Sequence, residues 1–223
     1  MRTGPAKFDL DSNFTMGNWF DGYAMLSKFY IQDDLVTLDK KFLKSDAYKR
    51  GMAAKKCVIT EFGTKAHQDP NRSLFARLVS AVMPIELSDN GQVSIFKLGM
   101  DLFATSETCF FRQIESNSLS TGEKFDTNKY FGVNIACAHP LTDETGATYN
   151  IGSSVLTGLK YNVVRIPAPS NPHETGKELM KKAKIICSIP SSWTGKIAFH
   201  EVSKKSIKFQ VLQKKSTYIF NLR

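Results

Sequence analysis

The sequence predicts an all-β protein, and two observations lead to this prediction. The first is a series of short segments rich in β-branched and aromatic residues, the residue types that favour strands. The second is the turn signals between these segments, at intervals of about ten residues, a spacing typical of sandwiches, barrels and propellers. The predicted strands cover residues 23–31, 57–62, 93–98, 102–114, 148–156, 160–167, 184–189, 196–202, 207–212 and 217–222.

Three turn signals stand between the predicted strands. Gly and Asn adopt the positive φ angles that tight hairpin turns require, so clusters of these residues mark the places where the chain reverses. The signals are Asp89-Asn90-Gly91, Thr121-Gly122 and the cluster from Asp143 to Gly146.

One segment breaks the strand pattern and has the periodicity of a short amphipathic helix. Between Asp69 and Pro84 the apolar residues recur at helical spacing, with Arg72 and Arg77 on other faces. Two interpretations stay open: this stripe packs on the core of the sheet, or it enters a membrane interface. A second candidate helix covers residues 177–182, in a polar stretch that reads as a connecting loop. The apolar stripe consists of Leu74, Phe75, Leu78, Val79, Val82 and Met83.

Composition and charge exclude several classes of protein. The chain has 223 residues, of which 42% are hydrophobic, and no apolar run approaches the roughly 20 residues that cross a bilayer. The net charge of +9 comes largely from residues 199–223, which hold six Lys or Arg against one Glu. Aromatic residues do not alternate with basic ones as a base-stacking surface requires, so we expect no nucleic-acid partner.

Cysteines and histidines give no metal signature by their spacing. The four cysteines form no CxxC pair, which argues against a zinc ribbon or a disulfide framework and favours a reducing compartment. The first residues contain no apolar run that would serve as a secretory signal, so a cytoplasmic location is expected. The four histidines, which form neither HxH nor HExxH, are His67, His139, His173 and His200.

Seven motifs, in order along the chain, closely resemble the carotenoid cleavage oxygenase family of animals, which includes β-carotene oxygenases and a retinoid isomerohydrolase. A single such motif would be weak, but seven in register indicate homology. They are Asn18-Trp19-Phe20-Asp21-Gly22, Lys44-Ser45-Asp46-Ala47-Tyr48, Thr60-Glu61-Phe62-Gly63-Thr64, Ser106-Glu107-Thr108, Ala138-His139-Pro140, Tyr149-Asn150-Ile151-Gly152 and Tyr161-Asn162-Val163-Val164-Arg165-Ile166-Pro167.

The resemblance implies a seven-bladed β-propeller with a ferrous ion, Fe(2+), held on its axis by four histidines, and a hydrophobic tunnel that leads to the ion. His139, in the Ala-His-Pro motif, matches the first iron ligand, and His200 resembles the second. Glu107 matches a carboxylate that accepts a hydrogen bond from a ligand imidazole and fixes its orientation. The segment after the Glu-Phe-Gly-Thr motif matches a membrane-contacting region, which implies peripheral association with internal membranes.

The chain also departs from the family pattern. Leu141 stands where the family commonly has His, Ile135 stands where it has Gly, and residues 201–205 differ from the family after His200. His67 and His173 lie outside any ligand motif, so the chain offers two of the four ligands. We therefore expect residues 1–200 to form part of a propeller domain, and residues 201–223 to form a Lys-rich tail outside the resemblance.

The implied activity is cleavage of a carotenoid double bond by O₂ and iron(II), giving apocarotenal or retinal products. Two alternatives remain open. One is a retinoid isomerohydrolase-like reaction, which needs no O₂. The other is a truncated, non-catalytic binding fragment, which is suggested by the missing ligands.

Overall fold

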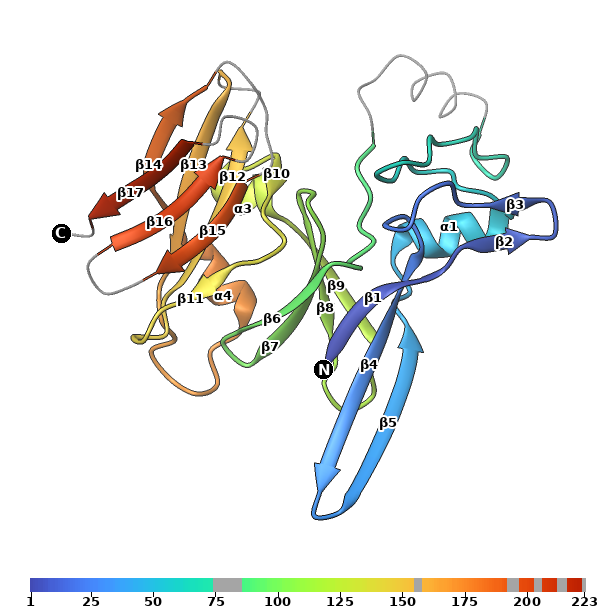
Figure 1. Ribbon diagram of the computed structural model, residues 1–223, viewed down its shortest axis with the longest axis horizontal. Coiled ribbons are helices and arrows are strands. Elements are labelled where there is room, and N and C mark those ends of the chain that lie inside the picture. The colour runs from blue at the N-terminus through green and yellow to red at the C-terminus, as the bar shows by residue number, and fades with distance from the viewer. Residues whose placement is uncertain (74–85, 155–157, 192–196, 203–205, 212–215, 222–223) are drawn as a thin grey trace. The chain divides into compact units, whose positions relative to one another are not determined.

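A computed structural model describes the chain apart from residues 74–85, 155–157, 192–196, 203–205, 212–215 and 222–223 (Figure 1). Strands dominate its secondary structure. The strands are β1 (Arg2–Lys7), β2 (Asp9–Asp11), β3 (Phe14–Thr15), β4 (Tyr23–Gln32), β5 (Leu35–Phe42), β6 (Ser94–Leu98), β7 (Asp101–Thr105), β8 (Phe110–Ile114), β9 (Thr121–Asp126), β10 (Ile135–Ala136), β11 (Leu141–Thr142), β12 (Thr148–Ser154), β13 (Lys160–Ile166), β14 (Lys184–Pro190), β15 (Ile197–Val202), β16 (Ser206–Val211) and β17 (Ser216–Asn221). The helices are α1 (Asp46–Ala54), α3 (Thr127–Phe131) and α4 (Gly176–Lys181).

The chain divides into two compact units. The first consists of Met1–Ile95, Ala104–Ser106 and Arg112–Lys124, and the second of Phe96–Phe103, Glu107–Phe111 and Phe125–Arg223. A four-stranded sheet in the order β6-β7-β8-β9 has residues in both units.

The first unit contains an antiparallel sheet in the order β1-β4-β5, the β2-β3 hairpin and α1. Helix α1 begins at Ser45, whose side chain accepts a hydrogen bond from the Tyr48 amide, and it ends at Lys55 in the left-handed conformation. A Cβ on Gly51 would lie 1.8 Å from the Tyr23 hydroxyl, so the absence of a side chain lets α1 lie against β4. The small apolar core consists of Leu10, Met16, Tyr23, Ala47, Cys57 and Ile59.

The second unit contains the sheet β10-β12-β13-β14, with β11 also paired to β12, and a three-stranded sheet in the order β15-β16-β17. Every residue of β12 is buried, as expected for a strand with neighbours on both edges and packed faces. Phe103 and Phe125 pack edge to face with ring centroids 5.3 Å apart. The core is completed by Leu98, Phe111, Phe131, Val133, Ala136, Val164, Ile166, Leu179 and Met180.

Most of the predicted strands are confirmed, with ends within a few residues of those expected; they correspond to β4, β6 and β12 to β17. The prediction of one strand over residues 102–114 is wrong, because the loop Ser106-Glu107-Thr108 separates β7 from β8. Residues 57–62 form no strand either. Two of their backbone hydrogen bonds are local, since the His67 amide donates to the Cys57 carbonyl and the Glu61 amide to the Thr64 carbonyl, and Thr60 forms an isolated parallel bridge with Leu87.

Turn and helix predictions had mixed outcomes. The Asp143 to Gly146 turn is confirmed between β11 and β12, whereas Thr121-Gly122 lies inside β9. Residues 177–182 fall in a genuine helix, α4, because Thr175 and Glu178 form a capping box at its start. The amphipathic segment lies outside the described residues. None of the described helices is long and apolar enough to cross a membrane.

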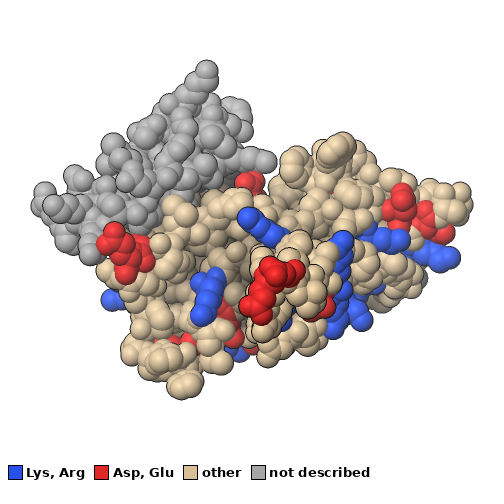
Figure 2. Space-filling model, turned by 60° about the horizontal axis from the view of Figure 1, so that its bottom comes forward, with Lys and Arg blue, Asp and Glu red and all other residues tan. Residues whose placement is uncertain are grey.

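Charged side chains of both signs are interspersed over the described residues on the face drawn in Figure 2.

Candidate functional site

His139 lies in a short loop that is held at both ends against one strand. The loop follows β10 and precedes β11, and both of these short strands pair antiparallel with β12. Ala138 is fully buried, whereas the side chain of His139 is exposed. The backbone on each side of the imidazole is thus fixed while the imidazole itself stays accessible to a ligand.

Cys137 and Asn150 hold the backbone that leads to His139. The Cys137 amide donates to the Ile151 carbonyl at 2.8 Å, and the Asn150 side-chain amide donates to the Cys137 carbonyl at 3.2 Å. The His139 amide donates to the Cys137 sulfur at 3.5 Å. Asn150 is 1% exposed, so its hydrogen bond is formed away from water, where its loss would be costly.

The close packing around Gly152 explains why the Tyr-Asn-Ile-Gly motif ends in glycine. A Cβ at this position would lie 2.1 Å from Val133 Cγ1 and 2.4 Å from the Ile135 carbonyl oxygen, so only glycine lets β10 approach β12 this closely. Ile135 itself lies in β10 and does not have positive φ. The departure from Gly at position 135 is therefore accommodated as an ordinary strand residue.

Glu107 lies in the loop between β7 and β8, next to the backbone that precedes His139. The adjacent Thr108 carbonyl accepts a hydrogen bond from the Ala136 amide at 3.0 Å, which ties the two segments together. Burial raises the pKa of the Cys137 thiol, and the negative charge of Glu107 raises it further. Glu107 is half-buried and near enough to influence a side chain two residues before His139.

His200 lies in β15, of which the structure describes the backbone. Strand β15 runs beside β11 and β12, and β11 begins directly after the His139-Pro140 loop (Figure 1). The pairing of β15 with β16 shifts register between Phe199 and Glu201, so His200 occupies a bulge. The backbone therefore brings the strand of His200 next to the strand that follows His139.

The other two histidines lie elsewhere. The His67 ring packs edge to face against Phe14 with centroids 5.4 Å apart, and His173 is exposed in the loop before α4. Among the residues that the structure describes, no group of three or more His, Cys, Asp or Glu side chains is placed to hold a metal ion. These residues alone therefore do not fit a complete iron site.

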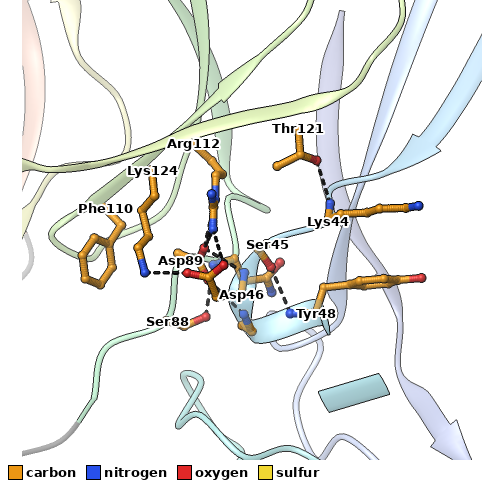
Figure 3. A network of polar contacts seen from close by, with 12 residues as sticks. Lys44, Ser45, Asp46, Tyr48, Ser88, Asp89, Phe110, Arg112, Thr121 and Lys124 are labelled. Carbon is orange, nitrogen blue, oxygen red and sulfur yellow. Dashed lines mark hydrogen bonds and ion pairs between the residues drawn. The ribbon is translucent and has the colours of Figure 1, made fainter. Parts of the chain in front are cut away.

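Sequence reasoning missed a polar network around the buried side chains of Asp89 and Arg112 in the first unit, drawn in Figure 3. The Asp89 carboxylate accepts hydrogen bonds from the amides of Asp46 and Ala47, at 2.9 and 3.0 Å, and from Arg112 Nε at 3.0 Å. Arg112 also contacts Asp46 at 2.8 Å, and Lys124 contacts Asp46 at 2.6 Å. A carboxylate at the first amides of α1 is favoured by the helix dipole, so this network anchors the helix.

The first and third sequence motifs are joined by hydrogen bonds in the same unit. The Asp21 carboxylate accepts from the Gly63 amide at 3.0 Å and from the Thr64 hydroxyl. The Thr64 hydroxyl oxygen in turn accepts from the Gly17 amide at 2.9 Å. The motifs that were noticed for their resemblance thus have a structural role, because they hold one another in place.

Known proteins resemble this chain over most of its length. The family model described as retinal pigment epithelial membrane protein matches residues 1–200. The β,β-carotene 15,15'-dioxygenases of Rattus norvegicus and Homo sapiens are each 38% identical, over 86% of this chain and 34% and 36% of their own lengths. The mitochondrial carotenoid-cleaving dioxygenase of Mustela putorius furo is 37% identical over 86% of this chain and 35% of its own length.

Solved structures show the same fold. A mutant of the Synechocystis apocarotenoid oxygenase aligns with a TM-score of 0.63 and 17% identity, and its cobalt-substituted form with a TM-score of 0.62 and 18% identity. Each alignment covers 93% of this chain and 41% of the other. The predicted all-β fold, part of a seven-bladed propeller, is confirmed, and the chain spans about a third of the length of the curated relatives it matches. The chain belongs to the carotenoid oxygenase family, whose matching model is that of the retinal pigment epithelial membrane protein.

Proposed function

We propose that this chain forms part of an iron(II)-dependent oxygenase that uses O₂ to cleave a carotenoid double bond, giving apocarotenal or retinal products. The observation that carries the proposal is the similarity to the β,β-carotene 15,15'-dioxygenases, which are 38% identical over 86% of this chain. The geometry agrees with it, because the Ala136 amide donates a hydrogen bond to the Thr108 carbonyl. This bond joins the Glu107 loop to the backbone that leads to His139, so two motifs far apart in sequence meet at one place. The names of the relatives, β-carotene dioxygenases, support a carotenoid as the substrate.

In this proposal His139 and His200 are metal ligands and Glu107 is a positioning residue. A carboxylate that accepts a hydrogen bond from the second nitrogen of a ligand imidazole fixes its tautomer and its orientation. The half-buried position of Glu107 beside the His139 backbone suits this role. Because the described residues hold no group of three or more candidate ligands, iron binding depends on ligands from outside them.

The membrane part of the proposal rests on residues outside the described part of the chain. Carotenoids dissolve in lipid, so an enzyme that acts on them gains from lying at a membrane surface. Leu74, Phe75, Leu78, Val79, Val82 and Met83 would contact the lipid, with Arg72 and Arg77 near the headgroups. We propose a cytoplasmic protein that associates peripherally with internal membranes; one relative is named as mitochondrial.

The experiment uses the protein at the length in which its source tissue makes it. The purified protein is loaded with iron(II), supplied with β-carotene in micelles under air, and analysed for aldehyde products and for bound iron. We expect His139→Ala to abolish both iron binding and product formation. His173→Ala is the matched control, because this imidazole is also exposed but lies outside the site. Absence of aldehyde with iron bound contradicts the cleavage proposal, and full iron content in His139→Ala contradicts the ligand assignment.

A second candidate function is a non-catalytic binding fragment. It is favoured by the absence of a group of three or more metal-binding side chains among the described residues. The intact mass of the endogenous protein separates the two candidates. A mass well above 25.0 kDa favours the enzyme, whereas a mass of 25.0 kDa without bound iron favours the fragment.

The O₂ dependence of the reaction separates the two enzymatic alternatives. Turnover of a retinoid substrate without O₂ would indicate the isomerohydrolase-like reaction instead of carotenoid cleavage.

A further inference from the structure

The loop that carries His139 is an enlarged bulge opposite β12. Ala136 of β10 pairs with Gly152, and Leu141 of β11 pairs with Tyr149. The four residues between Ala136 and Leu141 therefore stand opposite only two residues of β12. A bulge interrupts the strand ladder and changes the direction of the side chain that it carries. The groups that satisfy the backbone of this bulge therefore control the position of the exposed His139 imidazole.

Two side chains satisfy the backbone of the bulge where the ladder is interrupted. The Asn150 side-chain amide donates to the Cys137 carbonyl at 3.2 Å, and the Cys137 sulfur accepts from the His139 amide at 3.5 Å. The side-chain oxygen of Asn150 accepts from the Ile151 amide at 2.6 Å. Both ends of this carboxamide thus bind backbone groups, at a position that is 1% exposed. Loss of the carboxamide would remove a donor from a buried carbonyl, which favours rearrangement of the bulge.

We propose that Asn150 is a positioning residue for His139: its carboxamide fixes the bulge through the Cys137 carbonyl and so holds the imidazole in place for a metal ion. This inference rests on the proposed function, in which His139 is a metal ligand. Asn150 acts through the backbone two residues before His139. A ligand that is held in place beforehand needs less ordering when the metal binds, so the metal affinity depends on the bulge.

Asn162 on the neighbouring strand β13 is a matched control for Asn150. It is also 1% exposed and lies in the same sheet. Its side-chain amide donates to the Ser154 hydroxyl at 2.8 Å, and its side-chain oxygen accepts from the Ser188 hydroxyl at 2.7 Å. Within the described part of the chain, its side chain makes no hydrogen bond to the His139 bulge. Loss of either asparagine weakens the sheet, but only the loss of Asn150 should displace the imidazole.

Metal affinity and hydrogen exchange test the proposal, in the protein at the length in which its source tissue makes it. Cobalt(II) is titrated into the metal-free protein and followed by its visible absorption, and mass spectrometry measures hydrogen exchange in the peptide that contains residues 137–140. Asn150→Ala should weaken cobalt(II) binding by about 10- to 100-fold. It should also accelerate exchange in this peptide by about tenfold, as expected for the loss of one buried hydrogen bond. Asn162→Ala should leave both quantities close to their wild-type values.

A second substitution guards against an alanine variant that does not fold. Asn150→Leu also lacks the donor, but its side chain branches at the same atom as that of asparagine and leaves no cavity. It should weaken cobalt(II) binding and accelerate exchange as Asn150→Ala does. Circular dichroism and urea unfolding establish that each variant is folded and how much stability it has lost.

The outcomes separate this proposal from the proposed function. Unchanged cobalt(II) affinity and exchange in the folded Asn150 variants overturn the proposal. An equal loss of affinity in Asn162→Ala also overturns it, because the effect would then follow the stability of the sheet alone. A wild-type protein that binds no cobalt(II) contradicts the ligand assignment of the proposed function instead. The exchange of the peptide with residues 137–140 then decides by itself whether Asn150 holds the bulge.

Discussion

The two long antiparallel pairs, β4-β5 and β12-β13, have similar residues in opposite surroundings. Strand β12 is buried along its whole length, whereas β4 is buried only near its start and β5 is exposed almost throughout. Both pairs contain Ile, Val and Tyr, three residue types that favour strands. Their β propensity is thus alike, and what differs is how far neighbouring strands and core side chains bury them.

Strands β12 and β13 are buried by neighbouring strands at both edges and by side chains of the apolar core. Strand β14 pairs with β13, and β10 and β11 pair with β12. Side chains of β13, Val164 and Ile166, enter the same cluster as Phe103 and Leu179. Strand formation therefore follows from the residue types, whereas the free energy of burial follows from the tertiary contacts.

The largest difference should appear when an isoleucine of each pair is truncated. Ile151 in β12 is 1% exposed, so Ile151→Ala should lower the free energy of unfolding by about 4 kcal/mol through lost burial and a cavity. Ile31→Ala, at a position 72% exposed, is the matched variant and should change it by less than about 0.5 kcal/mol. Urea unfolding measures both. Equal losses in the free energy of unfolding would show that the Ile31 side chain is as deeply buried as that of Ile151.

A glycine pair gives the next largest effect. Gly152→Ala places a methyl group 2.4 Å from the Ile135 carbonyl oxygen and should destabilise the protein by about 3 kcal/mol. Gly4→Ala in β1 is the control, because nothing lies within 4 Å of the added methyl group. Thermal unfolding of the two variants tests this. A mild effect at Gly152 would mean that β10 can move away from β12, and the His139 loop would then be less firmly held than proposed.

Sequence patterns predicted a strand well where β-favouring residues follow one another without interruption. The β12 and β13 segments are continuous and β-rich, so their existence follows from residue types alone. Strand β5 was missed because the half that is farther from the hairpin turn carries Asp39, Lys40 and Lys41, which hide the alternation. Asp89-Asn90-Gly91 was interpreted as a turn, yet Asn90 is buried and its side chain bonds the Ala24 amide and the Gly22 carbonyl.

The candidate site was less accessible to sequence reasoning than the fold. No spacing rule singles out His139, and the family resemblance did so instead. The contact of the Glu107 loop with the His139 segment is made by the backbone groups of Thr108, in a loop, and Ala136, in β10, which are 28 residues apart, and periodicity does not encode such a contact. Asp89 was missed for the same reason, because its partners Asp46 and Arg112 are brought to it only by folding.

A buried carboxyl group in the first unit, Glu61, makes the stability of the protein depend on pH. Burial raises the pKa of Glu61 in the first unit to about 8, and the nearby charges of Asp21 and Asp89 add to the effect. Between about 4.5 and about 8 the folded state therefore binds more protons than the unfolded state, so the free energy of unfolding falls as pH rises through this window. The slope approaches about 1.4 kcal/mol per pH unit for one proton.

Glu61→Gln removes this titration. Its neutral amide can still accept the hydrogen bond that the Ser88 hydroxyl gives to Glu61 at 2.6 Å. We expect the variant to lose most of the decline in stability between pH 5 and pH 8, as measured by urea unfolding at several pH values. Glu115→Gln, in the exposed loop after β8, is the control. An unchanged slope in Glu61→Gln would show that Glu61 is ionised in the folded protein.

The smallest expected effects compare the caps of one helix from each unit. Ser45 caps α1 in the first unit and is fully buried, and Thr175 caps α4 in the second. Loss of an N-cap side chain costs about 1 kcal/mol. Burial alone would make Ser45→Ala the costlier change, but Asp89 still accepts hydrogen bonds from the Asp46 and Ala47 amides.

We therefore expect Ser45→Ala and Thr175→Ala to destabilise the protein by similar amounts, about 1 kcal/mol each. Thr175→Ala removes the hydroxyl oxygen that accepts from the Glu178 amide at 3.3 Å, which is one half of the capping box, and also the bond that this hydroxyl donates to the Glu178 carboxylate at 2.7 Å. Differential scanning calorimetry of Ser45→Ala, Thr175→Ala, Asp89→Asn alone and Asp89→Asn combined with Ser45→Ala measures how far Asp89 compensates for the lost Ser45 cap. If Asp89 supports the α1 amides, the double variant loses more than the sum of its single changes. Strict additivity would mean that the carboxylate holds Arg112 and contributes nothing to the cap.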